Sequence, residues 1–247
     1  MKLTFLGTRG EIEARTRRHR MHSSLLVSYR RANIMIDCGL DWLGKIERPH
    51  PNSIVLTHAH PDHAWGLQKG ASCPVFAPQK TWRTSKNFRI DNRQLIKERV
   101  ATKICGIRCE AFAVEHSLLA PAVGYRVSAG RACIFYAPDL IFIHDRAAAL
   151  KNAQIYIGDG ATLTRSFIRK RGERLIGHAA ISVQIGWCAK EGVPRAIITH
   201  CGSEIVAGDE MELVLWQNKS DARTPMIYYN STKVIRLEQI VLTKTSI

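Results

Sequence analysis

Short apolar segments recur along the chain, and polar loops with glycine, proline or asparagine separate them. The segments are rich in β-branched and aromatic residues, which favour strands. Less regular alternation near the end of the chain predicts closing strands within Thr224–Leu242. The pattern predicts ten earlier strands: Leu3–Leu6, Ser24–Tyr29, Asn33–Ile36, Ser53–Thr57, Pro74–Ala77, Arg108–Val114, Ala122–Ser128, Ala132–Tyr136, Gln154–Ile157 and Arg195–Thr199.

Three segments have helical features instead. Ala64–Lys69 stops before a glycine, Asp145–Lys151 is rich in alanine, and Ser182–Glu191 begins with a capping serine and ends at Gly192. Many short strands, followed by strands that alternate with helices, predict an α/β protein with layered sheets. Because we find neither an internal repeat nor a low-complexity linker, we expect a single domain over residues 1–247.

The composition excludes several classes of protein. With 45% hydrophobic and 23% charged residues, the chain is neither collagen-like nor disordered. No apolar run approaches the roughly 18 residues that a membrane helix needs, so we expect no membrane partner. The seven cysteines form no CxxC pair, which is typical of reduced thiols and predicts a cytoplasmic location.

The excess of positive charge indicates more about possible binding partners than the overall composition does. Lysine and arginine outnumber aspartate and glutamate by 36 to 21, which gives a net charge of +15. The basic residues cluster in segments 1–31, 69–110 and 165–174. Such clusters favour polyanionic partners, either nucleic acid or phosphorylated substrates, over a merely solvated surface. The first cluster contains Arg15, Arg17, Arg18 and Arg20.

The strongest chemical motif is the HxHxDH sequence that directly follows the predicted strand Ser53–Thr57. Imidazole and carboxylate are the usual protein ligands of zinc and similar divalent metals. A tight loop at the end of a strand can direct several of them toward one point. The motif therefore predicts a metal site whose ligands include His58, His60, Asp62 and His63.

Three more ligand-type residues, His116, Asp139 and His200, each follow an apolar predicted strand. In open sheets, binding sites lie outside the carboxyl ends of the strands. Any one of these residues, taken alone, is more simply an ordinary polar residue. Their order after the HxHxDH motif favours a second half of the same metal site.

With these residues in this order, the chain resembles the metallo-β-lactamase-fold hydrolases over essentially its whole length. The segments Leu6-Gly7-Thr8 and Ile36-Asp37-Cys38-Gly39 also match elements that precede the metal loop in that superfamily. The resemblance implies a four-layer αββα sandwich of two mixed β-sheets flanked by helices. It also implies two divalent metal ions, zinc in the first place and manganese as the alternative. One ion would be held by His58, His60 and His116, the other by Asp62, His63 and His200, and Asp139 would bridge them.

Within the superfamily, the chain most resembles the phosphodiesterase branch, which comprises ribonuclease Z and the cyclic-phosphate phosphodiesterases of phosphonate breakdown. Phe5-Leu6-Gly7-Thr8 and Gly177-His178, which we expect to open the last predicted helix, carry this resemblance. It implies that His178 supports the leaving group, with Asp159 as its acidic partner. Ribonuclease Z has a long tRNA-gripping arm between the residues that match His116 and Asp139. Only 22 residues separate them here, so the specific case for tRNA is lost.

The predicted function is a dinuclear-metal phosphodiesterase or nuclease, in which a hydroxide that bridges the metals attacks RNA or DNA and Asp62 is essential for catalysis. We expect Arg15, Arg17, Arg18 and Arg20 to hold the phosphates that flank the scissile one, because the guanidinium fork binds phosphate oxygens in pairs.

Three other functions stay open: hydrolysis of a small cyclic phosphate, glyoxalase-II-like hydrolysis of a thioester or lactone, and non-catalytic nucleic-acid binding. The net charge of +15 favours a polyanion, because a polyanion releases counterions on binding and a small thioester does not. The complete ligand set argues against a non-catalytic module. A homodimer and the choice between endo and exo cleavage are also left open.

Overall fold

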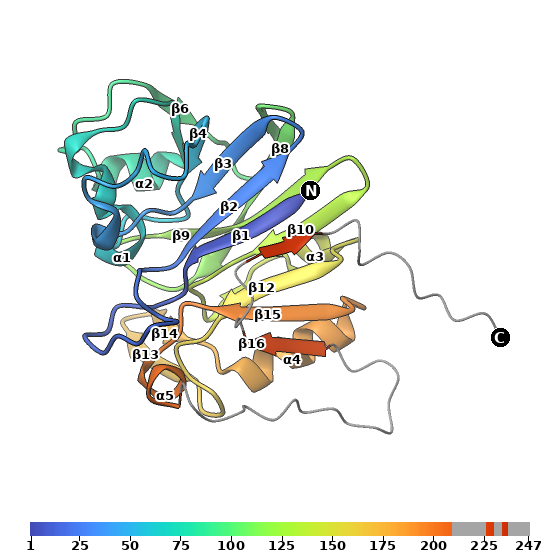
Figure 1. Cartoon of the computed structure of the whole chain (residues 1–247). Coiled ribbons are helices and arrows are strands. Elements are labelled where there is room, and N and C mark those ends of the chain that lie inside the picture. Colours follow the sequence, from blue (N-terminus) through green and yellow to red (C-terminus); the bar gives the residue numbers. More distant parts are fainter. Residues whose placement is uncertain (209–225, 230–233, 237–247) are drawn as a thin grey trace.

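Two mixed β-sheets form the centre of the computed structural model, which describes residues 1–208, 226–229 and 234–236 (Figure 1). The strands of the first sheet lie in the order β17 (Val234–Arg236), β1 (Lys2–Gly7), β2 (Ser24–Tyr29), β3 (Ala32–Ile36), β4 (Ser53–Val55), β5 (Val75–Ala77) and β6 (Arg93–Leu95). The order in the second sheet is β11 (Phe142–Ile143), β8 (Ile107–Glu115), β9 (Ala122–Ala129), β10 (Ala132–Tyr136), β12 (Ile155–Asp159), β15 (Arg195–Thr199) and β16 (Met226–Tyr229), with β7 (Thr102–Ile104) paired to β8.

Three apolar cores separate four layers. The central core lies between the sheets and contains buried side chains of both, such as Ile36 and Tyr125. The outer face of the first sheet packs against η1 (Leu40–Trp42), α1 (Pro61–Ala64), η2 (Trp65–Lys69) and α2 (Gln79–Thr84). The outer face of the second sheet packs against α3 (Arg146–Leu150) and α4 (Ile181–Lys190). Strands such as β4 and β12 are buried along their whole length because helices cover them from outside. The predicted four-layer α/β sandwich is confirmed.

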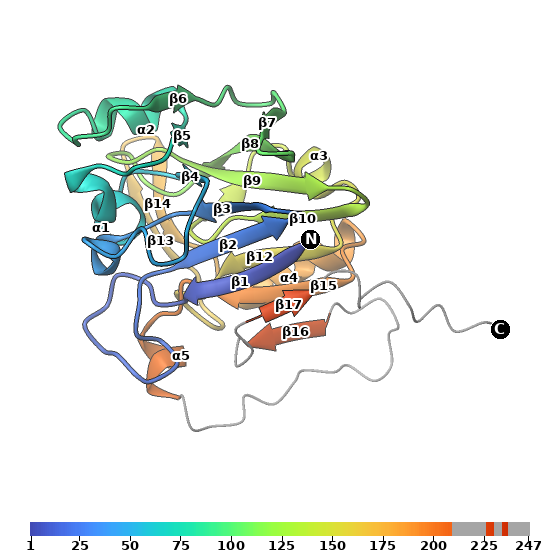
Figure 2. The same cartoon turned by 45° about the horizontal axis from the view of Figure 1, so that its top comes forward.

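Parallel strands direct the site-forming loops to one edge of the two sheets. In the first sheet β3, β4 and β5 are parallel, and in the second β10, β12 and β15 are parallel. The arrowheads of β12 and β15 point to the edge where α1 lies, at the left of Figures 1 and 2. The loops that leave these strands therefore meet at that edge, beside α5 (Ser203–Ala207).

The structure contains a strand at each of the ten early segments that the hydrophobic pattern predicts. Two helix starts differ from the prediction. The first helix begins at Pro61 and continues as η2, and α4 begins at Ile181 with Ala180 at its N-cap, so Ser182 lies in the first turn and is not a cap. The remaining predicted helix, Asp145–Lys151, is α3, where the Asp145 side chain accepts a hydrogen bond from the amide of Ala148.

Five described strands escaped the sequence pattern, namely the short strands β6, β7 and β11 and two neighbouring strands later in the chain. β13 (Phe167–Arg171) and β14 (Arg174–His178) form a separate two-stranded antiparallel ribbon. Gly177 and His178 therefore end a strand, and the expectation that they open a helix is wrong. All five residues of β13 are exposed and most are basic, so no apolar alternation marks the strand.

The late part of the chain returns to both sheets. Within the predicted closing segment Thr224–Leu242, β17 pairs with β1 and β16 pairs with β15, while the rest of that segment lies outside the described residues. No helix in the described ranges is long and apolar enough to cross a membrane. All seven cysteines are free thiols.

Candidate metal centre

The HxHxDH loop runs from the end of β4 into α1. Pro61 begins the helix, where its missing amide hydrogen costs nothing, and Asp62 and His63 occupy the first turn. The loop packs tightly against the segment after β3, where the amide of Cys38 donates to the carbonyl of His63 over 2.7 Å. A Cβ atom on Gly39 would lie 2.0 Å from the carbonyl oxygen of Asp62, so this approach requires glycine.

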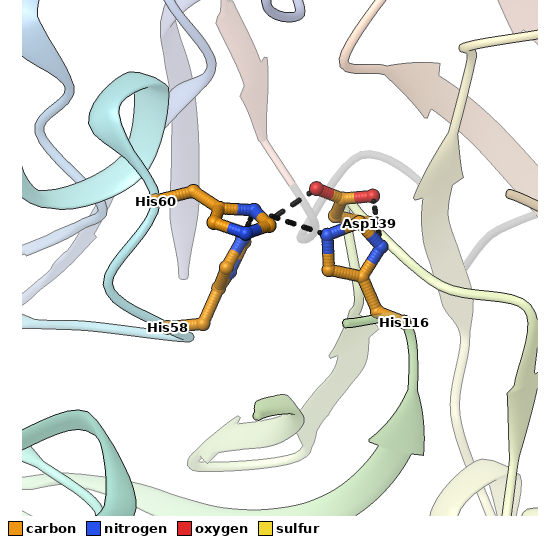
Figure 3. Close-up of side chains that lie close together, drawn as sticks. All are labelled: His58, His60, His116 and Asp139. Carbon is orange, nitrogen blue, oxygen red and sulfur yellow. Dashed lines mark hydrogen bonds and ion pairs between the residues drawn. The ribbon is translucent and has the colours of Figure 1, made fainter. Parts of the chain in front are cut away.

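The first group of donor atoms joins this loop to the second sheet. Figure 3 shows His58 and His60 on one side and His116, which follows β8, on the other, with the carboxylate of Asp139 beside them. His60 Nδ1 lies 3.1 Å from both His58 Nε2 and His116 Nε2. One donor atom from each of the four residues lies within 4.8 Å of the others, which is a spacing that one metal ion can bridge.

The second group contains Asp62, His63 and His200, and all three are buried. Asp62 Oδ2 lies 3.0 Å from His200 Nε2 and 3.2 Å from His63 Nε2. His200 directly follows β15 and has a φ of +52°, a left-handed conformation that is uncommon outside glycine. Uncommon backbone conformations of this kind cluster at functional sites, where the surrounding packing maintains them.

Asp139 lies between the two groups. Its Oδ2 atom is 3.5 Å from His58 Nε2, 3.7 Å from His63 Nε2 and 3.7 Å from His200 Nε2. Within the described part of the chain, the buried atoms Asp139 Oδ1 and His63 Nε2 form no well-aligned hydrogen bond. Each contacts only opposite charges, since Asp139 Oδ1 lies 2.9 Å from His116 Nδ1 and His63 Nε2 lies 3.2 Å from Asp62 Oδ2. Buried polar atoms without a well-aligned hydrogen bond are costly, and a cation at this point would satisfy both. The residues present therefore fit divalent metal binding.

Of the three residues that were predicted to be catalytic, Asp62 belongs to the second group, and Asp159 and His178 lie beside both groups. Asp159 ends β12, and its Oδ2 lies 2.8 Å from His178 Nδ1 while its Oδ1 lies 3.3 Å from His200 Nδ1. His178 Nδ1 is also 2.9 Å from Asp139 Oδ1. All seven predicted ligands and the two predicted catalytic residues outside the ligand set thus gather at one place.

Two further residues position the site, and the sequence did not assign them roles. Asp37 is completely buried, and its carboxylate contacts His63 Nδ1 at 3.0 Å and accepts hydrogen bonds from Thr57. Gln184 of α4 accepts from the amide of Asp159 and donates to that residue's carbonyl oxygen. The signal for Asp37 was its place in Ile36-Asp37-Cys38-Gly39, the segment before the metal loop that carries part of the family resemblance, whereas Gln184 has no local signal.

Burial keeps part of the imidazole set neutral. The surrounding protein, and next the charge of His63, hold the pKa of His58 well below its ordinary value. Burial and the neighbouring His116 lower the pKa of His60 to about 4. A neutral imidazole offers the lone pair that a metal ion requires, so both rings are in the form that binds metal.

Nearby carboxylates raise the pKa of other imidazole rings. Burial alone would lower the pKa of His63, but Asp62 and Asp37 raise it to about 10. In the same way Asp159 leads the charges that raise the pKa of His178 to about 11 against the effect of burial. Several buried carboxylates thus demand positive charge at the centre, which protons supply here and which metal ions can supply in their place.

A cavity of about 440 Å³ opens over the donor groups. Gly10, Glu11 and Ile12 of the β1–β2 loop line it on one side, and Phe167 of the ribbon also lines it. Further along the same loop, the four arginines at 15, 17, 18 and 20 are all exposed, and Arg15 donates to Asp41 Oδ1.

The sequence profile of the family described as "Beta-lactamase superfamily domain" matches residues 32–201. The chain belongs to this family. The prediction of a metal-dependent hydrolase of the metallo-β-lactamase superfamily is therefore confirmed at the level of the family. The matched range contains all seven predicted metal ligands. A search of curated protein sequences found no match.

Solved structures with the same fold have little sequence identity to the chain. A diphosphatase of the PhnP family is 18% identical, with a TM-score of 0.66 over 95% of this chain and 97% of that protein. The short form of human tRNase Z is 19% identical, with a TM-score of 0.61 over 83% and 94%. The metallo-β-lactamase fold protein YhfI of Bacillus subtilis is 15% identical, with a TM-score of 0.65 over 82% and 86%. At such identities the likeness establishes the fold alone.

Proposed function

We propose that the chain is a phosphodiesterase that holds two divalent metal ions and cuts nucleic acid, with zinc as the first choice of metal and manganese as the alternative. The position of Asp139 supports two ions most directly, because one of its oxygens lies within 3.7 Å of nitrogens from both donor groups. His58, His60 and His116 would hold one ion, and Asp62, His63 and His200 would hold the other, with Asp139 shared.

Bound divalent ions would supply electrostatic stabilisation of a phosphoryl group and a water of lowered pKa. The protein supplies the proton for the leaving group. His178 Nδ1 is engaged by Asp159 and Asp139, so its other ring nitrogen, Nε2, is the one available to a departing oxygen. The ring lines the cavity, and about a quarter of the side chain is exposed. His178 is thus the proposed general acid and Asp159 the residue that orients it.

Positive charge further along the β1–β2 loop favours a polymeric substrate. The β1–β2 loop that lines the cavity with Gly10–Ile12 continues into the arginines at 15, 17, 18 and 20, which we propose as contacts for flanking phosphates. Two of the structural neighbours, a diphosphatase and a tRNase Z, are named for substrates with phosphate groups. A nucleic acid therefore fits better than a small thioester.

The test is a cleavage panel with the metal-loaded protein. It contains bis-p-nitrophenyl phosphate, cyclic nucleotides, single-stranded DNA and RNA, precursor tRNA and a glutathione thioester. We expect two divalent ions per chain by elemental analysis and hydrolysis of the diesters. Asp62→Ala should abolish hydrolysis, because it removes a charged ligand, while Asp91→Ala, at an exposed position, should not. Fewer than one ion per chain after reloading would refute the two-metal proposal.

The panel also separates the alternatives. Cleavage of cyclic nucleotides alone would favour the small-substrate phosphodiesterase, and cleavage of the thioester alone would favour the glyoxalase-II-like reaction. Binding of nucleic acid without hydrolysis of any compound would favour a non-catalytic module. The single domain over residues 1–247, the cytoplasmic location and the homodimer stay predictions.

A further inference from the structure

The β13–β14 ribbon stands apart from the two sheets. It pairs with neither of them, and every residue of β13 is exposed. Four of its residues, Arg169, Lys170, Arg171 and Arg174, carry positive charge, and Glu173 in the turn region is its one acidic residue. A short basic ribbon of this kind has no packing role in the cores described above. The sequence marked it only as the third basic cluster.

The base of the ribbon is fixed to the metal centre. The amide of Gly177 donates to the carbonyl of His116 over 3.0 Å, and His116 Nδ1 lies 3.1 Å from the carbonyl oxygen of Gly177. A Cβ atom on Gly177 would lie 1.7 Å from the carbonyl oxygen of Phe167, so the two strands meet there with no room for a side chain. The next residue, His178, reaches Asp159 and Asp139. The ribbon therefore leaves the metal centre in a fixed direction.

One face of the ribbon points the same way as His178. Phe167 is directly opposite His178 in the pairing register, and Arg171 is opposite Arg174. Side chains alternate along a strand, and directly opposed residues share a face, so Phe167, Arg169 and Arg171 lie on the His178 face. Lys170 lies on the other face. Successive residues of one face are about 7 Å apart in an antiparallel strand.

This face thus presents an ordered series that starts at the metal centre. Phe167 comes first, lines the cavity, and is 61% exposed, which is unusual for a phenylalanine. Arg169 follows, and the opposed pair Arg171 and Arg174 comes last, near the turn. An exposed aromatic ring followed by guanidinium groups is the combination that binds single-stranded nucleic acid, through base stacking and phosphate contacts.

We infer that the β13–β14 ribbon is the arm that holds single-stranded nucleic acid on the path out of the metal centre. Phe167 stacks on the base next to the scissile phosphate, and Arg169, Arg171 and Arg174 contact the phosphates that follow. The inference rests on the proposed nuclease function and adds the segment that selects the substrate. The proposed arm lies between Asp159 and the end of β14. The arm of ribonuclease Z would lie earlier in the sequence, between His116 and Asp139.

The first experiment compares two faces of one ribbon. A triple variant, Arg169→Ala with Arg171→Ala and Arg174→Ala, is measured against Lys170→Ala, which removes a charge from the opposite face. Binding of fluorescent single-stranded RNA and DNA oligonucleotides is followed by anisotropy at several salt concentrations. We expect the triple variant to lower the slope of log affinity against log salt by about 2, because each lost phosphate contact removes about 0.7. Lys170→Ala should lower this slope by much less than the 0.7 expected for one phosphate contact.

The second experiment concerns the ring. Phe167→Leu should weaken oligonucleotide binding about fivefold or more, because stacking on an aromatic side chain is lost. Phe167→Trp should restore it, and an apolar wall without a stacking role would not distinguish leucine from tryptophan. The triple arginine variant should impair oligonucleotide hydrolysis at least tenfold more than hydrolysis of bis-p-nitrophenyl phosphate. Because these side chains are exposed, urea midpoints should match that of the wild type.

The outcomes keep the two proposals apart. A loss of salt slope in Lys170→Ala equal to one third of the loss in the triple variant, or an unchanged salt slope in the triple variant, would overturn the arm while leaving hydrolysis intact. Binding that depends on the arm, without hydrolysis of any diester, would support the arm and refute the nuclease function. If wild-type protein cleaves bis-p-nitrophenyl phosphate but binds neither RNA nor DNA oligonucleotides, the arm is wrong and a small phosphodiester becomes the substrate.

Discussion

Replacing Asp37 by asparagine tests whether this buried carboxylate positions a metal ligand. Asp37 Oδ1 accepts from the amide of Thr57 over 2.8 Å, and Oδ2 lies 3.0 Å from His63 Nδ1. In Asp37→Asn, the backbone amide of Thr57 needs the remaining carbonyl oxygen, so the new NH₂ group faces His63 Nδ1. Two donors then meet, and His63 must move its proton to Nε2 to relieve the conflict. Nε2 is the nitrogen that faces Asp62 and Asp139, and a protonated Nε2 cannot bind metal.

The expected loss of metal affinity is the one typical of replacing a residue that orients a metal ligand. Such changes typically lower metal affinity 10- to 100-fold, which corresponds to about 1.4–2.7 kcal/mol. The metal-free protein should also lose roughly 1.5–3 kcal/mol of folding stability, because the hydrogen bond between His63 and a charged carboxylate is lost. Zinc affinity is measured by competition with a chromophoric chelator, and stability by urea unfolding without metal. Asp91→Asn, at an exposed position, is the matched control.

Zinc affinity and unfolding stability together show whether Asp37 orients His63 or only stabilises the fold. Zinc affinity within twofold of the wild type would refute the tautomer reasoning, even if the metal-free variant were less stable. Asp37 would then only brace the turn between β3 and the metal loop. Loss of affinity with little loss of stability would place its effect on His63 alone.

Three more predictions concern the mouth of the site and the pH dependence of folding. His178→Ala should slow diesters with alkoxide leaving groups about a hundredfold or more, and p-nitrophenyl esters far less, because p-nitrophenolate leaves without a proton; equal losses would indicate a positioning role. Neutralising all four arginines at 15, 17, 18 and 20 should flatten the salt dependence of oligonucleotide binding by about 0.7–0.9 per lost contact, and an unchanged slope would make the loop a solvated surface. Burial, and next the charge of Arg9, lower the pKa of His22 to about 4. As the pH falls, the unfolded chain therefore binds the proton before the folded protein does. The contribution of His22 to the stability of the metal-free protein is complete above pH 6.5 and is lost as the pH falls toward 4. In His22→Gln this loss between pH 7 and pH 5 should shrink in urea unfolding, and an identical loss would exclude His22 as its source.

Local patterns were sufficient for much of the fold. A buried strand needs a run of apolar residues wherever it lies, so the ten early strands could be predicted from the sequence. The candidate metal ligands could be located in the sequence for a related reason. Each lies within a few residues of the end of an apolar strand, and the HxHxDH motif concentrates four of them in six positions.

Other features depend on contacts between distant segments. The β13–β14 ribbon has almost no apolar pattern, because neither face packs in a core, and its position is fixed by backbone contacts with His116. The role of Asp37 arises only when the segment after β3 meets the HxHxDH loop 26 residues later, and that of Gln184 only when α4 packs on β12. The sequence by itself determined which side chains can bind metal and where strands run, because composition and periodicity are local. Tertiary structure decided which groups orient those ligands and which basic segment adjoins the site, because hydrogen bonds between distant residues leave no periodic trace in the chain.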